Sequence, residues 1–85
     1  MFQEYGQYIV ADPKICHGKL TFRGTRVFVS DILDNVAEGL DWNDIIRKWN
    51  YSFPREAIAD AIRFAKEAFV EQNRFQQLTE EALAA

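Results

Sequence analysis

The sequence predicts a mainly α-helical domain, a three-helix bundle with a small N-terminal β-hairpin. Two observations predict this class. Before residue 30, short hydrophobic runs have the two-residue period of strands, and after residue 30 hydrophobic residues recur at helical spacing. With 85 residues, we expect one domain over 1–85. Its expected parts are a hairpin region at 9–29, the bundle at 30–69, and a C-terminal helical extension or frayed tail at 70–85.

The hairpin region is expected from short strand-like runs. Residues 9–10 and 20–22 have the composition of strands, and the Asp-Pro pair at 12–13 requires a turn between them. Residues 27–29 have the same alternation of a strand, and with them the runs could make a small antiparallel hairpin or a three-stranded patch. Gly24 precedes them and can adopt the positive φ that a tight turn often needs.

The first two helices are expected from their caps and their spacing. The first is expected over about residues 31–38, with Ser30 at the N-cap position and Gly39 just past the end. The second is expected over about residues 42–49, with Asp41 as its N-cap. A four-residue turn then leads into the third helix.

The third helix carries the strongest periodic pattern. Pro54 suits its first turn. An inward-facing apolar stripe follows at helical spacing: Ile58, Ala61, Ile62, Ala65, Ala68 and Phe69. Beyond this stripe the pattern loosens. Phe75 and Leu78 prolong the helix in one interpretation, and residues 79–81 cap a short separate turn in the other.

Motifs along the N-terminal two thirds resemble a known family. The run Arg23-Gly24-Thr25-Arg26-Val27, with Asp12-Pro13-Lys14-Ile15-Cys16 before it and Ala37-Glu38-Gly39 after it, is similar to domain-of-unknown-function family 433. The resemblance covers roughly Ile9 to Ala65. It implies a homeodomain-like three-helix bundle behind a β-hairpin. It also implies an antitoxin encoded beside a PIN-like ribonuclease toxin.

The helix lengths favour a helix-turn-helix geometry, because two short helices precede a much longer one. The outer side of the third helix would then enter the major groove, where arginine can bind guanine or phosphate. The predicted DNA contacts are Arg23, Arg47, Lys48, Arg55, Arg63 and Lys66. However, the third helix and tail together carry four cations and six acids. A protein-interaction or structural module that binds no DNA is therefore the alternative.

The charge is unevenly distributed. The net charge is −3 and the pI about 5.0, which argues against a general nucleic-acid coating protein. Residues 14–26 carry four cations and no acid, whereas residues 31–44 carry five acids and no base. These charges form opposite faces or are simply solvated. An acidic face could imitate RNA in a nuclease cleft, and an apolar tail could dock on a partner. The predicted toxin contacts come from these two surfaces: Asp34, Glu38, Phe69, Phe75 and Leu78.

The run Gly24-Thr25-Arg26 is interpreted mainly as a structural motif. Arg26 is expected to bridge carbonyl groups or to pair with Asp31 or Asp34, which would fix the hairpin to the bundle. Arg23, at the turn, is expected to be exposed and available to a phosphate or the minor groove.

The sequence offers little evidence of a catalytic or metal-binding site. Cys16 and His17 are adjacent, and there is no second Cys or His to complete a metal site or a thiol catalytic group. We therefore expect no enzyme activity, metal or cofactor. A single cysteine, no long apolar run and no signal-like N-terminus are consistent with a cytoplasmic protein without a membrane span.

Self-association is expected from the small size and the rich apolar content. A chain of this length buries only about 60 to 65% of its unfolded surface, so a partner would add needed stability. Trp42 and Trp49 lie seven residues apart, on one side of the second helix, and are expected in the core or at a dimer interface. A homodimer is the expected assembly.

Overall fold

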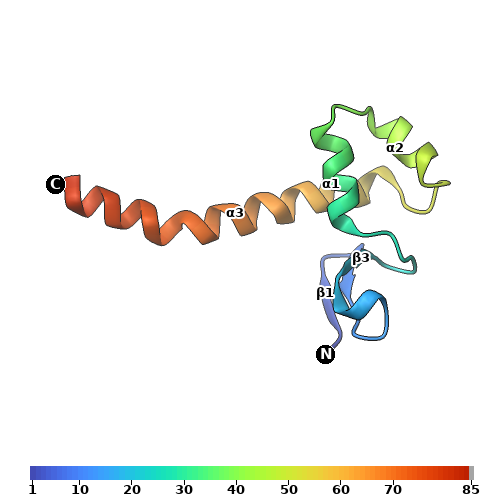
Figure 1. Cartoon of the computed structure of the whole chain (residues 1–85), viewed down its shortest axis with the longest axis horizontal. Helices are drawn as coiled ribbons and strands as arrows, with labels where there is room; N and C mark the ends of the chain where they lie inside the picture. Colours follow the sequence, from blue (N-terminus) through green and yellow to red (C-terminus); the bar gives the residue numbers. More distant parts are fainter. Residues whose placement is uncertain (85) are drawn as a thin grey trace.

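In a computed structural model the chain forms three helices and a small N-terminal sheet, with helices dominant (Figure 1). The structure describes the backbone of residues 1–84 and the side chains of residues 1–73. The elements, in chain order, are β1 (Gln3–Tyr5), β2 (Ile9–Ala11), the short 3-10 helix η1 (Cys16–Gly18), β3 (Leu20–Phe22), α1 (Val29–Ala37), α2 (Trp42–Lys48) and α3 (Arg55–Ala84).

The sheet is an antiparallel meander in the order β1-β2-β3. Ile9 at its centre lies opposite Tyr5 on one side and Phe22 on the other. The predicted strands at 9–10 and 20–22 are confirmed. The strand β1 was not predicted, because all three of its residues are exposed and give no alternation of buried and polar positions.

The predicted third strand at residues 27–29 is wrong. Only an isolated bridge joins Phe28 to Thr21, and Val29 is already the first residue of α1. Phe28 occupies the N-cap position, so Ser30 lies in the first turn and is not the cap. The physical reason is burial: Val29 and Ile32, three residues apart, both point into the core.

The predicted end of α1 and start of α2 are confirmed. Gly39 has a φ of +86°. Its N–H donates to the carbonyl of Val36 at 3.0 Å, and the N–H of Leu40 donates to the carbonyl of Asn35 at 3.2 Å. These two bonds form a Schellman motif. Asp41 then caps α2, accepting a hydrogen bond from the Asn43 N–H at 3.1 Å.

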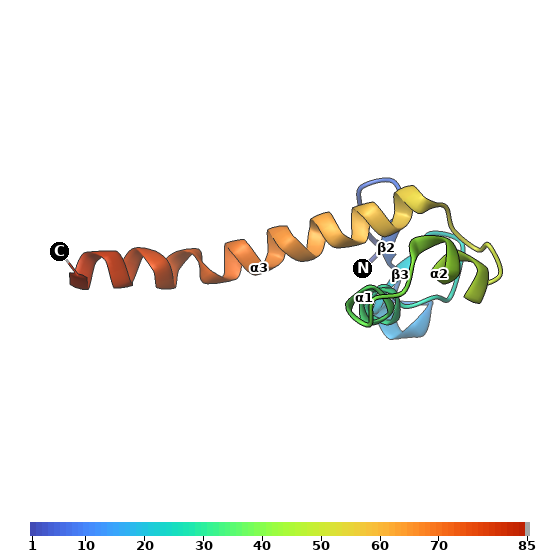
Figure 2. The ribbon, with the colours of Figure 1, turned by 90° about the horizontal axis from the view of Figure 1, so that it is seen from above.

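The helix α3 extends far beyond the rest of the molecule, as two perpendicular views show (Figures 1 and 2). It begins at Arg55, one residue after Pro54, which was predicted to open it, and the molecule measures 53 × 33 × 18 Å. The predicted inward stripe holds for Ile58 and Ala61, but its far members Ala65, Ala68 and Phe69 are exposed. The cause is the size of the head, meaning residues 1–54, which covers only the first turns of α3.

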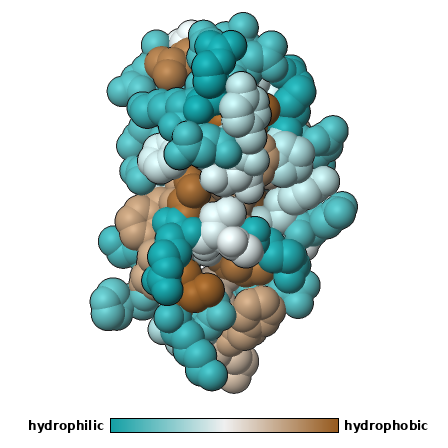
Figure 3. Space-filling view, turned by 90° about the vertical axis from the view of Figure 1, so that its right-hand side faces the viewer, coloured by the Kyte–Doolittle hydropathy of each residue, from teal (hydrophilic) through white to brown (hydrophobic). Residues whose placement is uncertain are grey.

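At the end of the head that faces away from the free part of α3, the surface is mostly hydrophilic, with hydrophobic atoms in separate patches (Figure 3). Within the described chain, no helix has the length and apolar content needed to cross a bilayer.

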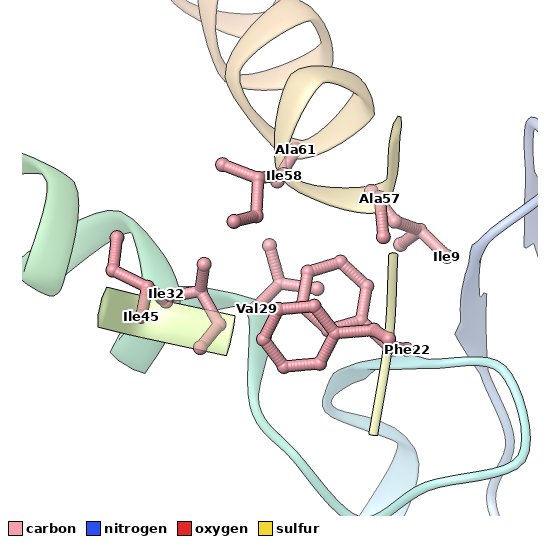
Figure 4. Packing of buried hydrophobic residues seen from close by; sticks show 9 residues of the cluster. Ile9, Phe22, Val29, Ile32, Ile45, Ala57, Ile58 and Ala61 are labelled. Atoms are coloured by element: carbon pink, nitrogen blue, oxygen red, sulfur yellow. The ribbon is translucent and has the colours of Figure 1, made fainter. Parts of the chain in front are cut away.

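The core lies where α1, α2 and the sheet meet the first turns of α3 (Figure 4). Its buried members are Ile9, Phe22, Val29, Ile32, Ile45, Phe53, Ala57, Ile58 and Ala61. The rings of Phe22 and Phe53 lie 4.6 Å apart. Trp42 and Trp49 pack against this core as partly buried side chains. Alanine at the contact face of α3 lets that helix approach closely.

Candidate nucleic-acid interface

The loop between β3 and α1 is built by Gly24 and Thr25. The Thr25 N–H donates to the Phe22 carbonyl at 3.0 Å, and Gly24, inside that turn, has a φ of +76°. The Thr25 hydroxyl donates to the same carbonyl at 2.8 Å and accepts from the Val27 N–H at 3.0 Å. Gly24 and Thr25 therefore fix the backbone of the loop. The charged residues of the loop are Arg23 and Arg26.

Both arginines of this loop are exposed, as predicted for Arg23, but Arg23 has two partners that were not predicted and Arg26 lacks the predicted carboxylate partner. Arg23 donates from Nε to the Gln7 carbonyl and from Nη2 to Glu4, each at 2.9 Å, and so ties β3 to β1 and to the β1–β2 turn. Arg26 is exposed, and it pairs with neither Asp31 nor Asp34 among the described side chains. Without β1 in the sequence prediction, no partner for Arg23 was visible.

At the end of α2, Arg47 and Lys48 are both exposed. Arg47 donates to Asp44 at 2.9 Å. A hydrogen bond with Tyr51 and then the charge of Asp44 raise the pKa of Arg47 above its ordinary value. The Lys48 ammonium lies 6.0 Å from the centre of the Trp49 ring.

At the start of α3, Arg55 is held without a carboxylate. Its Nη1 donates to the Asn43 side-chain oxygen at 2.8 Å, and its guanidinium lies 5.2 Å from the centre of the Trp42 ring. Both partners are neutral, so they restrict the arginine without cancelling its charge. A guanidinium has five N–H donors, and most of those of Arg55 remain for another acceptor.

Further along α3, Arg63 pairs with Asp60 and lies over the Phe64 ring. The Asp60 side chain is only 11% exposed and sits against the head. Lys66 is exposed and forms no ion pair among the described side chains.

The cations of α3 share one outward face. Arg55, Ala59, Arg63 and Lys66 follow at spacings of four, four and three residues, and all four are exposed. Such spacing places side chains above one another on a helix. Of the six predicted DNA contacts, Arg55, Lys48 and Lys66 have no carboxylate partner in the described residues, whereas the other three are each paired with one.

The predicted toxin contacts lie on α1 and on the projecting part of α3. Asp34 and Glu38 are exposed, and Glu38 accepts a hydrogen bond from the Asn35 side chain at 3.2 Å. Phe69 is 68% exposed. The side chains of Phe75 and Leu78 lie outside the described residues.

A buried amide was missed by sequence reasoning. Asn35 is 5% exposed, and its side-chain oxygen accepts a hydrogen bond from the Trp49 indole N–H at 3.0 Å, which links α1 to the end of α2. Asn35 lies between Ile32 and Val36, which is consistent with an inward-facing position. However, burial is predicted from apolar residues at helical spacing, and asparagine is polar. In the described part of the chain, no group of three or more His, Cys, Asp or Glu could hold a metal ion.

The fold and the charged faces define a small, helix-dominated domain with a polar outer surface on its longest helix. The family model described as "Protein of unknown function (DUF433)" matches residues 9–65, more than half of the chain. The chain therefore belongs to this family. No curated protein and no solved structure matches it.

Proposed function

We propose that the chain is an antitoxin-type regulatory module that binds operator DNA and neutralises a PIN-like ribonuclease toxin. The proposal treats α2, the turn after it and α3 as a homeodomain-like helix-turn-helix, with α3 as the recognition helix. The observation that carries it is Arg55. This arginine is exposed at the start of α3, fixed by Asn43 and Trp42, and uncompensated by any carboxylate in the described residues.

The rest of the outward face supports the same proposal. Lys66 and Arg63 continue the line of cations from Arg55, and Ala59 between them is small enough to let the helix approach a groove. Arg63 keeps N–H donors beyond its bond to Asp60, and its side chain is 56% exposed. Positively charged side chains on one helix face can bind phosphates and position a recognition helix.

Fluorescence anisotropy with the chain's own upstream DNA, beside a shuffled duplex and at two salt concentrations, tests DNA binding. We expect tighter, salt-sensitive binding to the upstream DNA. Arg55→Ala should weaken it by roughly tenfold or more and reduce the salt slope by about 0.9 if one phosphate contact is lost. Arg26→Ala removes the same charge from the loop before α1 and serves as the control. Equal binding to both duplexes, or equal effects of both variants, would reject the proposal.

For the toxin, we propose the acidic surface of α1 as the main contact. Asp34 and Glu38 are exposed and lie one helical turn apart, which suits a basic nuclease cleft. Reversing both charges to lysine should abolish binding to the ribonuclease encoded by the adjacent gene, measured by calorimetry. Glu56→Lys, at the exposed start of α3, is the matched control. Undiminished binding by the double variant would remove this contact surface from the proposal.

The alternative is an interaction module that binds no DNA. Three of the six candidate cations are already paired with carboxylates, and the chain is acidic overall. Under this alternative the anisotropy experiment shows no specific binding. The neighbouring gene product still binds, with no dependence on Arg55.

A further inference from the structure

An open apolar groove of about 710 Å³ lies where α3 leaves the head. Leu20 of β3 and Leu33 of α1 line one wall, and Phe64, Ala65 and Ala68 of α3 line the other. Leu20 is 43% exposed, although it is a large apolar side chain at the end of a short strand. The described chain leaves this groove uncovered, so these side chains face solvent in the single chain.

The apolar side of α3 does not stop with the head. Ala61 and Phe64 contact the head, and Ala68 follows Phe64 by four residues, on the same side of the helix. In the sequence Phe75 comes seven residues after Ala68, and Leu78 three residues later, which continues a heptad-like spacing; the exposed Glu71, seven residues after Phe64, is the one charged position in this series. We call this line from Ala61 to Leu78 the α3 seam. A helix in water depends mainly on packing of such a face for its stability.

The single chain also exposes more surface than a compact monomer. Its accessible surface is 6274 Å², about 1,100 Å² more than the roughly 5,200 Å² expected for a protein of 9.9 kDa. Its radius of gyration is 15.6 Å, against about 12 Å for a compact domain of this length. A stable interface takes about 800 Å² from each partner. The excess surface is therefore as large as one side of a stable interface.

We propose that the α3 seam and the groove form the interface of a homodimer, with α3 of a second copy as the occupant. The two α3 helices run antiparallel, so the far part of each helix lies along the other and its end enters the other's groove. Two-fold symmetry makes both contacts identical and leaves neither groove open. A parallel pair would place both heads at one end and leave both grooves empty.

The apolar character of the groove and of the α3 seam, together with the excess surface of the single chain, favours a second copy over other occupants. One chain supplies both the groove and a seam of matching apolar character, so no different partner is required to cover either. Phe69 follows Ala68 directly and lies to the side of the seam, where it remains exposed for the toxin of the proposed function. The dimer does not rest on that function, since neither DNA nor toxin takes part in it.

Sedimentation equilibrium of the full chain over a wide concentration range tests the interface. We expect a dimer, and we expect Ala68→Glu to raise its dissociation constant by about 100-fold, because a carboxylate would be buried in an apolar seam. Ala59→Glu is the matched control. It makes the same change on the outward face of the same helix, where Ala59 is also exposed, and it should leave the dimer intact. Circular dichroism should show equal helix content in both variants at high concentration.

A second measurement tests the orientation. In a Cys16→Ser background, chains carrying Ala65→Cys are mixed with chains carrying Ala82→Cys and oxidised gently. Antiparallel helices should give a mixed disulfide between the two kinds of chain, whereas bridges between like chains would contradict this orientation. A monomer at all concentrations would overturn the proposal. Equal dimerisation of Ala68→Glu and Ala59→Glu would also overturn it. That is the result expected if only the toxin fills the groove.

Discussion

Thr25 shows how one side chain can hold an irregular segment. Its hydroxyl bridges the Phe22 carbonyl and the Val27 N–H, two backbone groups on opposite sides of a tight turn. Phe22 is in the core, so any movement of this turn would also disturb the packing beneath it. The short polar side chain after a glycine is thus a structural requirement of the loop.

Thr25→Val should lower the free energy of unfolding by about 1–3 kcal/mol. Valine keeps the shape of the side chain but leaves a partly buried N–H and a carbonyl without this partner. Thr25→Ser keeps the hydroxyl and should lose much less. Urea denaturation of both variants measures the difference, and equal stability of the two would show that the hydroxyl has no such role.

At the same scale, the partners of charged side chains could be predicted only in part. Asp41 was predicted as a cap because an N-cap interaction is local in sequence. The partners of Arg23 were not predicted, because they lie 16 and 19 residues away, on and beside a strand that was not predicted. The buried Asn35 was missed since its partner, Trp49, is 14 residues away.

Among the elements, the end of α1 depends on a left-handed residue. Gly39 has a φ of +86°, and a side chain there would meet no atom within 4 Å. Gly39→Ala should therefore cost about 1 kcal/mol from backbone conformation alone, without any steric clash. Gly39→Asn should cost less, because asparagine adopts this conformation more readily. Thermal unfolding of the three proteins should give the order Gly, Asn, Ala.

Elements with strong local signals were predicted well. All three helices and two strands were expected from periodicity and caps, and the structure contains them. The alternation over residues 27–29 was misleading, because the β-branched Val29 is the first residue of α1 and is buried in the core. The extent of burial along α3 could not be predicted, since it depends on how far the head reaches.

For the whole molecule, the excess surface has a thermodynamic consequence. If two chains share the α3 seam, association stabilises the folded state by mass action. The midpoint of thermal unfolding should then rise with protein concentration in the wild type and in Ala59→Glu. It should stay constant in Ala68→Glu over the range where that variant is monomeric. Melting curves recorded by circular dichroism at several concentrations provide this comparison.

The meander order of the sheet bears on how fast the chain folds. Neighbouring strands are consecutive in sequence, so β1, β2 and β3 pair by closing short loops, which costs little chain entropy. The contact of α3 with β2 joins segments separated by more than forty residues and needs a much longer loop. We therefore expect the hairpins and helices to form early and the docking of α3 to limit the rate. Truncating Ile58 should then slow refolding, whereas a change in β1 should mainly speed unfolding.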